Sequence, residues 1–161
     1  MNFDDEINKI ITTDNESVNK VLRNYASSLL GGNMYNLGNA VGKQVKDATG
    51  DMVYEYDLMK SHNYKYLDDY YHCKANYNAA KRGVIGRATA TFLGNEKEVV
   101  DYLRNRYIKG KDFMEARHDA LHDIDVNKIG RERAEMSEYN SAQDACADFR
   151  EKNKSLPKKY W

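Results

Sequence analysis

The sequence predicts an all-α protein, and three features of its 161 residues support that prediction. The chain has a single proline, late at position 157, whereas a proline inside a helix breaks or kinks it. Residues branched at Cβ are sparse, and alternating apolar and polar runs are short, so strands are not favoured. Apolar residues instead recur every three or four positions, which is the period of one helical face. We therefore expect a small helix bundle.

Length, charge and hydropathy restrict the class of protein further. A chain of this length forms one domain, which we divide into an N-terminal helical extension over residues 1–50 and a bundle over residues 51–161. The 25 basic and 25 acidic residues cancel, so no overall charge favours nucleic acid as a partner. Mean hydropathy is −0.86, and no apolar run is long enough to cross a bilayer. Residues 4–6 are all acidic where a signal peptide would be basic, so we expect either export by a dedicated secretion system or a cytoplasmic protein.

The first 50 residues form two amphipathic helices in this interpretation. Thr13 and Glu16 make a capping box before the first helix, and Gly50 ends the second. Gly38 and Gly42, four positions apart, would let a neighbouring helix approach closely. The segment is either a loosely packed part of the bundle or a surface that binds lipid or a partner. The apolar residues of that surface are Val18, Val21, Leu22, Leu29, Leu37, Val41 and Val45.

The remaining chain predicts five helices. They cover residues 51–60, 68–82, 87–108 and 111–136, followed by a short helix that Ser141 caps. We expect a bend near Gly94 in the third of them. Ile108, Phe113 and Met114 lie on the apolar faces of the two longest helices, and we expect these faces to be buried.

The stretch from Asp51 to Gly83 resembles the serum amyloid A family. The match runs without a gap and ends on the run Ala-Ala-Lys-Arg-Gly at 79–83. It resumes at Asp123, Asn127 and 130–131, then at 149–150 and 156–157. Similar domains stand at the C-termini of bacterial Rhs-type polymorphic secreted proteins. The resemblance implies an antiparallel bundle of the serum amyloid A type, with a C-terminal tail that wraps around it.

The matched residues include a polar set that the resemblance assigns to two facing helical stripes. Charged and amide groups inside a helix interface must pair with one another, so we interpret the set as structural hydrogen bonds and salt bridges. A carboxylate beside a histidine is also a hydrolytic arrangement, but neither a nucleophile nor a phosphate-binding loop accompanies it, so an enzyme is the less favoured reading. The set is Asp68, His72, Asn76, Arg82, Asp123, Asn127 and Arg131.

The wrapping tail implied by the resemblance bears on the two cysteines. If the tail folds back over the bundle, Cys73 and Cys146 come close together, either as a disulfide or as two buried thiols. The residues that anchor the tail in this interpretation are Phe149, Arg150, Leu156, Pro157 and Tyr160.

One pair of histidines has the spacing of metal ligands. His118 and His122 are four positions apart on one helical face, but the sequence shows no third ligand. We therefore expect a solvated face there, without a metal ion, and we expect no cofactor elsewhere.

These features lead to three functional hypotheses. The resemblance implies a non-enzymatic domain that binds a lipid or membrane surface, or a protein partner. A second hypothesis is a microbial secreted effector or toxin that acts on membranes and has an immunity protein as its partner. The third is a phage or secretion-associated structural or accessory protein held by partner contacts.

Overall fold

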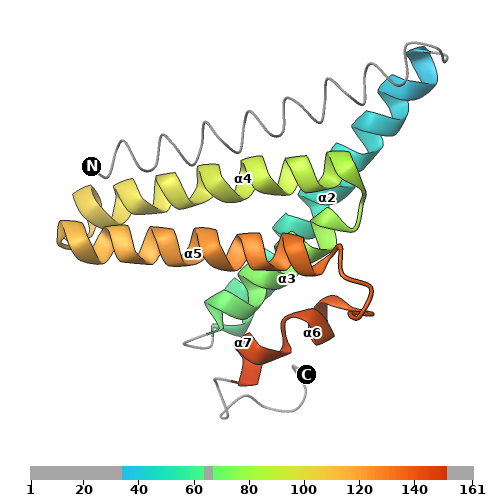
Figure 1. Ribbon diagram of the computed structural model, residues 1–161. Helices are drawn as coiled ribbons and strands as arrows, with labels where there is room; N and C mark the ends of the chain where they lie inside the picture. Colours follow the sequence, from blue (N-terminus) through green and yellow to red (C-terminus); the bar gives the residue numbers. More distant parts are fainter. Residues whose placement is uncertain (1–33, 64–66, 152–161) are drawn as a thin grey trace.

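The computed structural model describes residues 34–63 and 67–151, and every regular element in that part of the chain is a helix (Figure 1). The all-α class expected from the sequence is therefore confirmed. The elements are α2 (Met34–His62), α3 (Asp68–Ala80), α4 (Val84–Leu103), the π-helix η1 (Arg104–Ile108), α5 (Phe113–Arg133), α6 (Ala142–Ala145) and α7 (Ala147–Glu151).

Helix α3 is the element on which the other helices pack. It contacts α2, α4, α5 and both short helices, and nine of its 13 residues are buried. Helices α4 and α5 lie side by side as a long hairpin, and α2 crosses this hairpin near the end that rests on α3 (Figure 1). The opposite end of the hairpin extends beyond α2 and α3 (Figure 1).

The apolar core has one large part and one small part. The large part lies where α3 meets α5 and the two short helices, and the small part lies between α4 and α5 inside the hairpin. The buried residues of the large part are Leu67, Tyr70, Tyr71, Cys73, Tyr77, Val126, Ala134, Ala142, Ala145, Cys146 and Phe149. Those of the small part are Tyr102, Ala116, Ala120 and Ile124.

Helix α2 continues through Gly50, so the helix end predicted there is wrong. A glycine inside a helix costs about 1 kcal/mol relative to alanine. Packing outweighs that cost here, because Ala48 is fully buried against α3 and α4, and Met52 packs beside it. The close helix approach expected at Gly38 and Gly42 is not found at Gly42 among the described residues, since a Cβ at that position would meet no atom within 4 Å. The division of the chain at residue 50 stays a prediction, and α2 crosses it.

The predicted break after residue 60 is confirmed, because α2 ends at His62 and α3 begins at Asp68.

The link between α3 and α4 is short and depends on two glycines. Helix α3 ends at Ala80, and Gly83 then adopts a φ of +98°, a backbone conformation that residues with a Cβ rarely adopt. A Cβ on Gly86 would lie 2.5 Å from the carbonyl oxygen of Ala79, so this glycine lets α4 start in contact with α3.

Helix α4 has no break at Gly94, where a bend was expected. Its irregular part comes later, as the π-helical turn η1. Helix α5 begins with a side-chain cap, in which Asp112 accepts hydrogen bonds from the backbone N–H groups of Met114 and Glu115. It ends at Arg133, three residues before the predicted end at Met136.

Candidate functional site

Four members of the predicted polar set meet in the interior, where α3, α4 and α5 come together. Asn76 Oδ1 accepts a hydrogen bond from Arg131 Nη1 at 2.8 Å, and Asn76 Nδ2 donates to Asn127 Oδ1 at 2.7 Å. His72 Nδ1 lies 3.1 Å from the same Asn127 Oδ1. All four side chains are buried. Gly94 provides the room for them, because a Cβ there would lie 3.4 Å from Asn127 Nδ2.

A fifth buried polar residue, Glu98, completes the cluster and was not predicted. Its exposed fraction is 0%. Glu98 Oε1 accepts hydrogen bonds from Asn127 Nδ2 and from Lys97 Nζ, both at 3.3 Å. Lys97 also pairs with Asp101 at 2.8 Å. Glu98 follows Gly94 by four positions and so lies on the same face of α4. That spacing is the sequence signal that Glu98 faces the cluster. A bend at Gly94, which was expected, would have interrupted the helical spacing between the two residues.

Asp123 of the predicted set lies at the edge of this cluster. Its Oδ2 is 4.0 Å from His72 Nε2, and its side chain is partly exposed. The pKa of Asp123 is raised to about 6, because burial and the neighbouring Glu98 raise it by more than the opposing charge of His72 lowers it. Burial also raises the pKa of Glu98 and lowers the pKa of His72. Near neutral pH, His72 is therefore uncharged, and both carboxyl groups take up protons more readily than in water.

Arg82 lies apart from the other members of the set, which corrects that part of the prediction, whereas Asp68 is near enough to His72 for its charge to offset part of the effect of burial on the pKa of that ring. Asp68 is exposed in the first turn of α3. Arg82 lies beyond the end of α3 at Ala80, so the helical spacing that would have aligned it with Asn76 does not continue that far. It forms two hydrogen bonds with Asp51 of α2, at 2.7 and 2.9 Å.

Two cavities adjoin the buried polar cluster. The first has a volume of about 250 Å³ and lies between α2, α3 and α4. Apolar side chains such as Met52, Val53 and Leu93 line most of it, and Glu98 lies in its wall. The second has a volume of about 820 Å³ and a polar lining that includes Asp123. His72 and Lys97 border both cavities.

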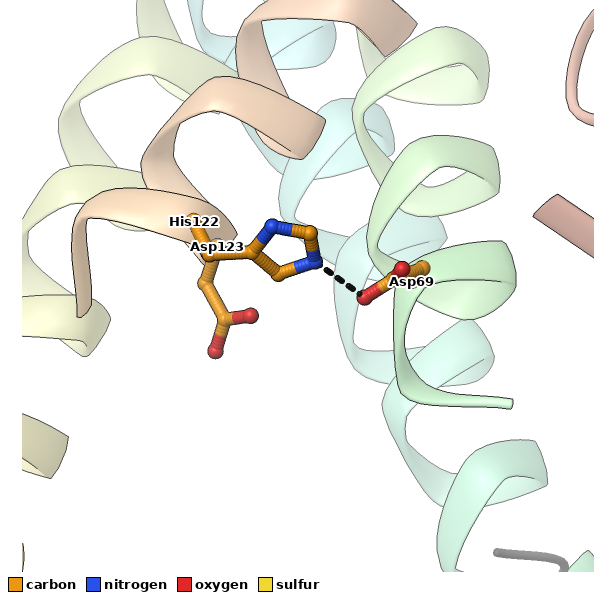
Figure 2. Close-up of side chains that lie close together, drawn as sticks. All are labelled: Asp69, His122 and Asp123. Carbon is orange, nitrogen blue, oxygen red and sulfur yellow. Dashed lines mark hydrogen bonds and ion pairs between the residues drawn. The ribbon is translucent and has the colours of Figure 1, made fainter. Parts of the chain in front are cut away.

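The histidine pair on α5 lies on the second cavity. Figure 2 shows the imidazole of His122 directed at Asp69 of α3, with Nε2 3.0 Å from Asp69 Oδ1 and Asp123 beside them. His118 and His122 stack in parallel with ring centroids 6.4 Å apart. His122 is exposed, as the expectation of a solvated face requires. The third side chain near this pair is Asp69, which the sequence did not indicate because it comes from another helix, α3.

The tail is attached to α3 by a disulfide. Cys73 and Cys146 are bonded, with their Cα atoms 5.9 Å apart, so the expected proximity is present and the bonded alternative applies. Phe149 is buried in the large core, and the Arg150 guanidinium lies 5.9 Å from the ring centroid of Tyr70. Leu156, Pro157 and Tyr160, the other predicted anchors, lie outside the described residues.

The far end of the α4–α5 hairpin, residues 100–114, exposes apolar side chains, of which Ile108, Phe113 and Met114 were expected to be buried. We call this end the hairpin tip. Ile108 and Tyr107 are 79% and 75% exposed. The apolar spacing identified one face of each helix correctly as apolar, but no third helix of the described chain covers that face at this end (Figure 1). The other exposed apolar residues of the tip are Val100, Leu103, Phe113 and Met114.

The surface predicted for lipid or partner binding in residues 18–45 is described only in part. Val41 is half-buried and Val45 is exposed on α2. Leu37 belongs to α2, but its side chain is outside the description, as are the whole residues Val18, Val21, Leu22 and Leu29. No helix among the described residues is both long and apolar enough to span a bilayer.

Comparison with known proteins gives a consistent result. The family model "Serum amyloid A protein" matches residues 39–160. Serum amyloid A-3 protein of Bos taurus is 30% identical over 100 residues, which are 62% of this chain and 76% of the relative. Serum amyloid A protein of Ovis aries is 33% identical over 50% of this chain and 72% of its own length. The Equus caballus protein is 34% identical over 52% of this chain and 74% of its own length.

Proposed function

The chain belongs to the serum amyloid A family, and we propose that it is a non-enzymatic helical domain that binds the surface of a lipid bilayer through its hairpin tip. The observation that carries this proposal is the exposure of Tyr107 and Ile108, which are the two most exposed large apolar side chains in the described part of the chain. Burying a side chain of this kind completely stabilises by about 1.5 to 3 kcal/mol. Several such residues at one end of the molecule favour association with an apolar phase.

The charges of the hairpin tip favour anionic lipid as the occupant. Tyrosine and basic residues beside aliphatic ones are typical of segments that lie in the headgroup region of a bilayer. Each basic side chain near an anionic membrane surface contributes about 1 kcal/mol. The charged residues of the tip are the cationic Arg104, Arg106, Lys109 and Lys111 and the anionic Asp101 and Asp112. Their net positive charge contrasts with the zero net charge of the whole chain.

Sedimentation with vesicles tests this proposal. The full chain is mixed with vesicles of phosphatidylcholine alone and with vesicles that also contain phosphatidylglycerol. We expect binding to the anionic vesicles and a loss of at least about tenfold in the variant Ile108→Glu, because a carboxylate opposes both burial and the surface charge. Val84→Glu is the matched control, since Val84 is 51% exposed at the opposite end of α4. Equal binding by the two variants would remove the hairpin tip from the function.

The predicted lipid surface of residues 18–45 gives a second arm for the same experiment. A chain that starts at residue 34 keeps all the described helices and lacks Val18, Val21, Leu22 and Leu29. If the hairpin tip carries the binding, this shortened chain keeps most of its affinity for anionic vesicles. A shortened chain that no longer binds, beside an Ile108→Glu variant that still does, would assign the contact to the N-terminal segment instead.

The effector role is a more specific form of the same proposal, and it rests on the resemblance alone. In that form, the contact with bilayers harms a competing bacterium, and an immunity protein blocks it. Expression of the chain in a bacterial host tests this, and the harm should disappear with Ile108→Glu. If the unaltered chain does not affect growth when it is expressed in the cytoplasm or in the periplasm, the chain is a binding domain without toxicity.

A further inference from the structure

Three groups with free electron pairs converge at the edge of the buried polar cluster. The first is Glu98, whose two carboxylate oxygens have different surroundings. Oε1 accepts hydrogen bonds from Lys97 and Asn127, whereas Oε2 is buried without a hydrogen-bond donor. A buried carboxylate oxygen without a partner is costly, so this atom needs a proton or a cation.

The second group is His72 Nε2, whose protonation follows from the hydrogen bonds around it. The His72 carbonyl can only accept and the Arg131 guanidinium can only donate, so their bonds to Asn76 fix Nδ2 and Oδ1 of that amide. Asn76 Nδ2 then donates to Asn127 Oδ1, which is thus an acceptor. His72 Nδ1, 3.1 Å from the same oxygen, must carry the proton.

It follows that His72 Nε2 carries a lone pair in the neutral ring. This atom faces the third group, the Asp123 carboxylate, with 4.0 Å between Nε2 and Oδ2. Two acceptors face each other there without a donor between them. One ligand atom from each of His72, Glu98 and Asp123 can be chosen so that all three atoms lie within 4.8 Å of one another.

We propose that His72 Nε2, Glu98 Oε2 and the Asp123 carboxylate bind one divalent transition-metal ion, of which Zn²⁺ fits best. One imidazole and two carboxylates match the ligands that Zn²⁺ takes at about 2.0 to 2.2 Å, so a small inward movement of the side chains closes the site. The two carboxylates neutralise the ion, and the polar cavity beside His72 and Asp123 admits a water molecule as the fourth ligand.

The surroundings of the site support this assignment. Asn127 holds the far nitrogen of His72, which is the arrangement that orients a metal-binding imidazole. Lys97 is the nearest cation, but Asp101 pairs with it at 2.8 Å and so reduces its repulsion of a metal ion. Lys97 also bonds to Glu98 Oε1, which leaves Oε2 for the metal.

A second group of side chains shares Asp123 and has to be distinguished. Asp69, His122 and Asp123 also lie close enough together to hold an ion (Figure 2). There, however, His122 is exposed and already bonded to Asp69. Replacing His122 removes the exposed group alone, and replacing Glu98 removes the buried group alone, so these two substitutions separate the two sites.

The test uses the full chain without an affinity tag, freed of metal with a chelator, and Zn²⁺ as the probe. Calorimetry should show about one equivalent bound. Glu98→Gln should weaken the affinity by roughly 100-fold, because it removes a charged ligand, whereas His122→Asn should change it less than about twofold. Co²⁺ should give the visible absorption of a four-coordinate site in the unaltered chain and in His122→Asn, but not in Glu98→Gln.

Folding of each variant is checked by circular dichroism. If Glu98→Gln does not fold, Asp123→Asn replaces it, since this side chain is at the edge of the cluster, and it should lose Zn²⁺ while His122→Asn keeps it. Failure of the unaltered chain to bind Zn²⁺ or Co²⁺ would overturn the proposal. So would binding that His122→Asn abolishes and Glu98→Gln preserves, because the ion would then lie at the exposed group.

Discussion

Arg131 holds a charged guanidinium inside the bundle, and its removal should be costly. Arg131→Ala leaves Asn76 Oδ1 without its donor, in a cluster where solvent cannot replace it. We expect a loss of roughly 2 to 4 kcal/mol in the free energy of unfolding, measured with denaturant. Arg82→Ala is the control, because Arg82 pairs with Asp51 at the surface and should lose less than about 1 kcal/mol. Similar losses for both variants would contradict the buried position of Arg131.

Two helical glycines should respond in opposite directions to alanine. A Cβ on Gly130 of α5 would lie 3.1 Å from Cys73 Cα and closer still to its carbonyl oxygen, so Gly130→Ala forces α5 away from α3. We expect a loss of about 2 kcal/mol or more. Gly42 has open space around it, and Gly42→Ala should stabilise by up to about 1 kcal/mol. Thermal unfolding of both variants measures the difference, and a Gly130→Ala variant as stable as Gly42→Ala would mean that the two helices lie further apart.

Residues predicted from sequence were correct where the family motif and the helical spacing agreed. His72, Asn76, Asn127 and Arg131 meet as expected, because each pair is four positions apart and so lies on one face of its helix. Glu98 was not predicted, because a glutamate is normally exposed and only the long-range approach of α3 and α5 buries it.

At the scale of elements, the disulfide determines how firmly the tail is held. It closes a loop of 73 residues between α3 and the short helices. The loss of chain entropy in the unfolded state predicts a stabilisation of about 4 kcal/mol. We expect no free thiol in denatured protein prepared without reductant, and a lower denaturant midpoint after reduction. Two titratable thiols in such a preparation would show that the bond does not form in solution.

The ion pair of Arg133 with Asp148 gives the same tail an acid-sensitive contact. The hydrogen bonds from Arg133 hold the pKa of Asp148 below its usual 3.8. A lowered folded-state pKa means that the contact stabilises fully above 3.8 and is lost as the pH falls through the lower, folded value. The difference in melting temperature between the unaltered chain and Asp148→Asn should therefore be constant at higher pH and shrink below 3.8. In an Arg133→Ala background this pH dependence should disappear, and its persistence would point to another group.

The elements show where sequence reasoning reaches its limit. The helix breaks before α3 and after it were predictable, because glycines and polar residues mark them. The continuity of α2 through Gly50 was not, since it depends on packing of Ala48 against two other helices. The π-helical turn η1 likewise leaves no clear mark in the spacing of apolar residues.

For the whole molecule, the sequence predicted the class of fold but not the shape of its surface. Periodicity and composition give helices, and the family motif gives their arrangement around α3. Periodicity cannot tell whether another helix covers an apolar face. Ile108 and Phe113 were therefore expected in the core, whereas the hairpin extends past α2 and α3 and exposes them (Figure 1). The proposed lipid contact rests on this difference.

The most direct measurement of that contact labels one introduced cysteine and leaves the two native cysteines unchanged. Because both form the disulfide, Ile108→Cys introduces the only free thiol, which can carry a fluorophore that brightens in an apolar environment. The same label at Lys128→Cys, exposed on α5 away from the tip, is the control. Anionic vesicles should brighten and blue-shift the label at position 108 and leave that at position 128 unchanged. An unchanged label at 108, or an equal response at both positions, would contradict the account.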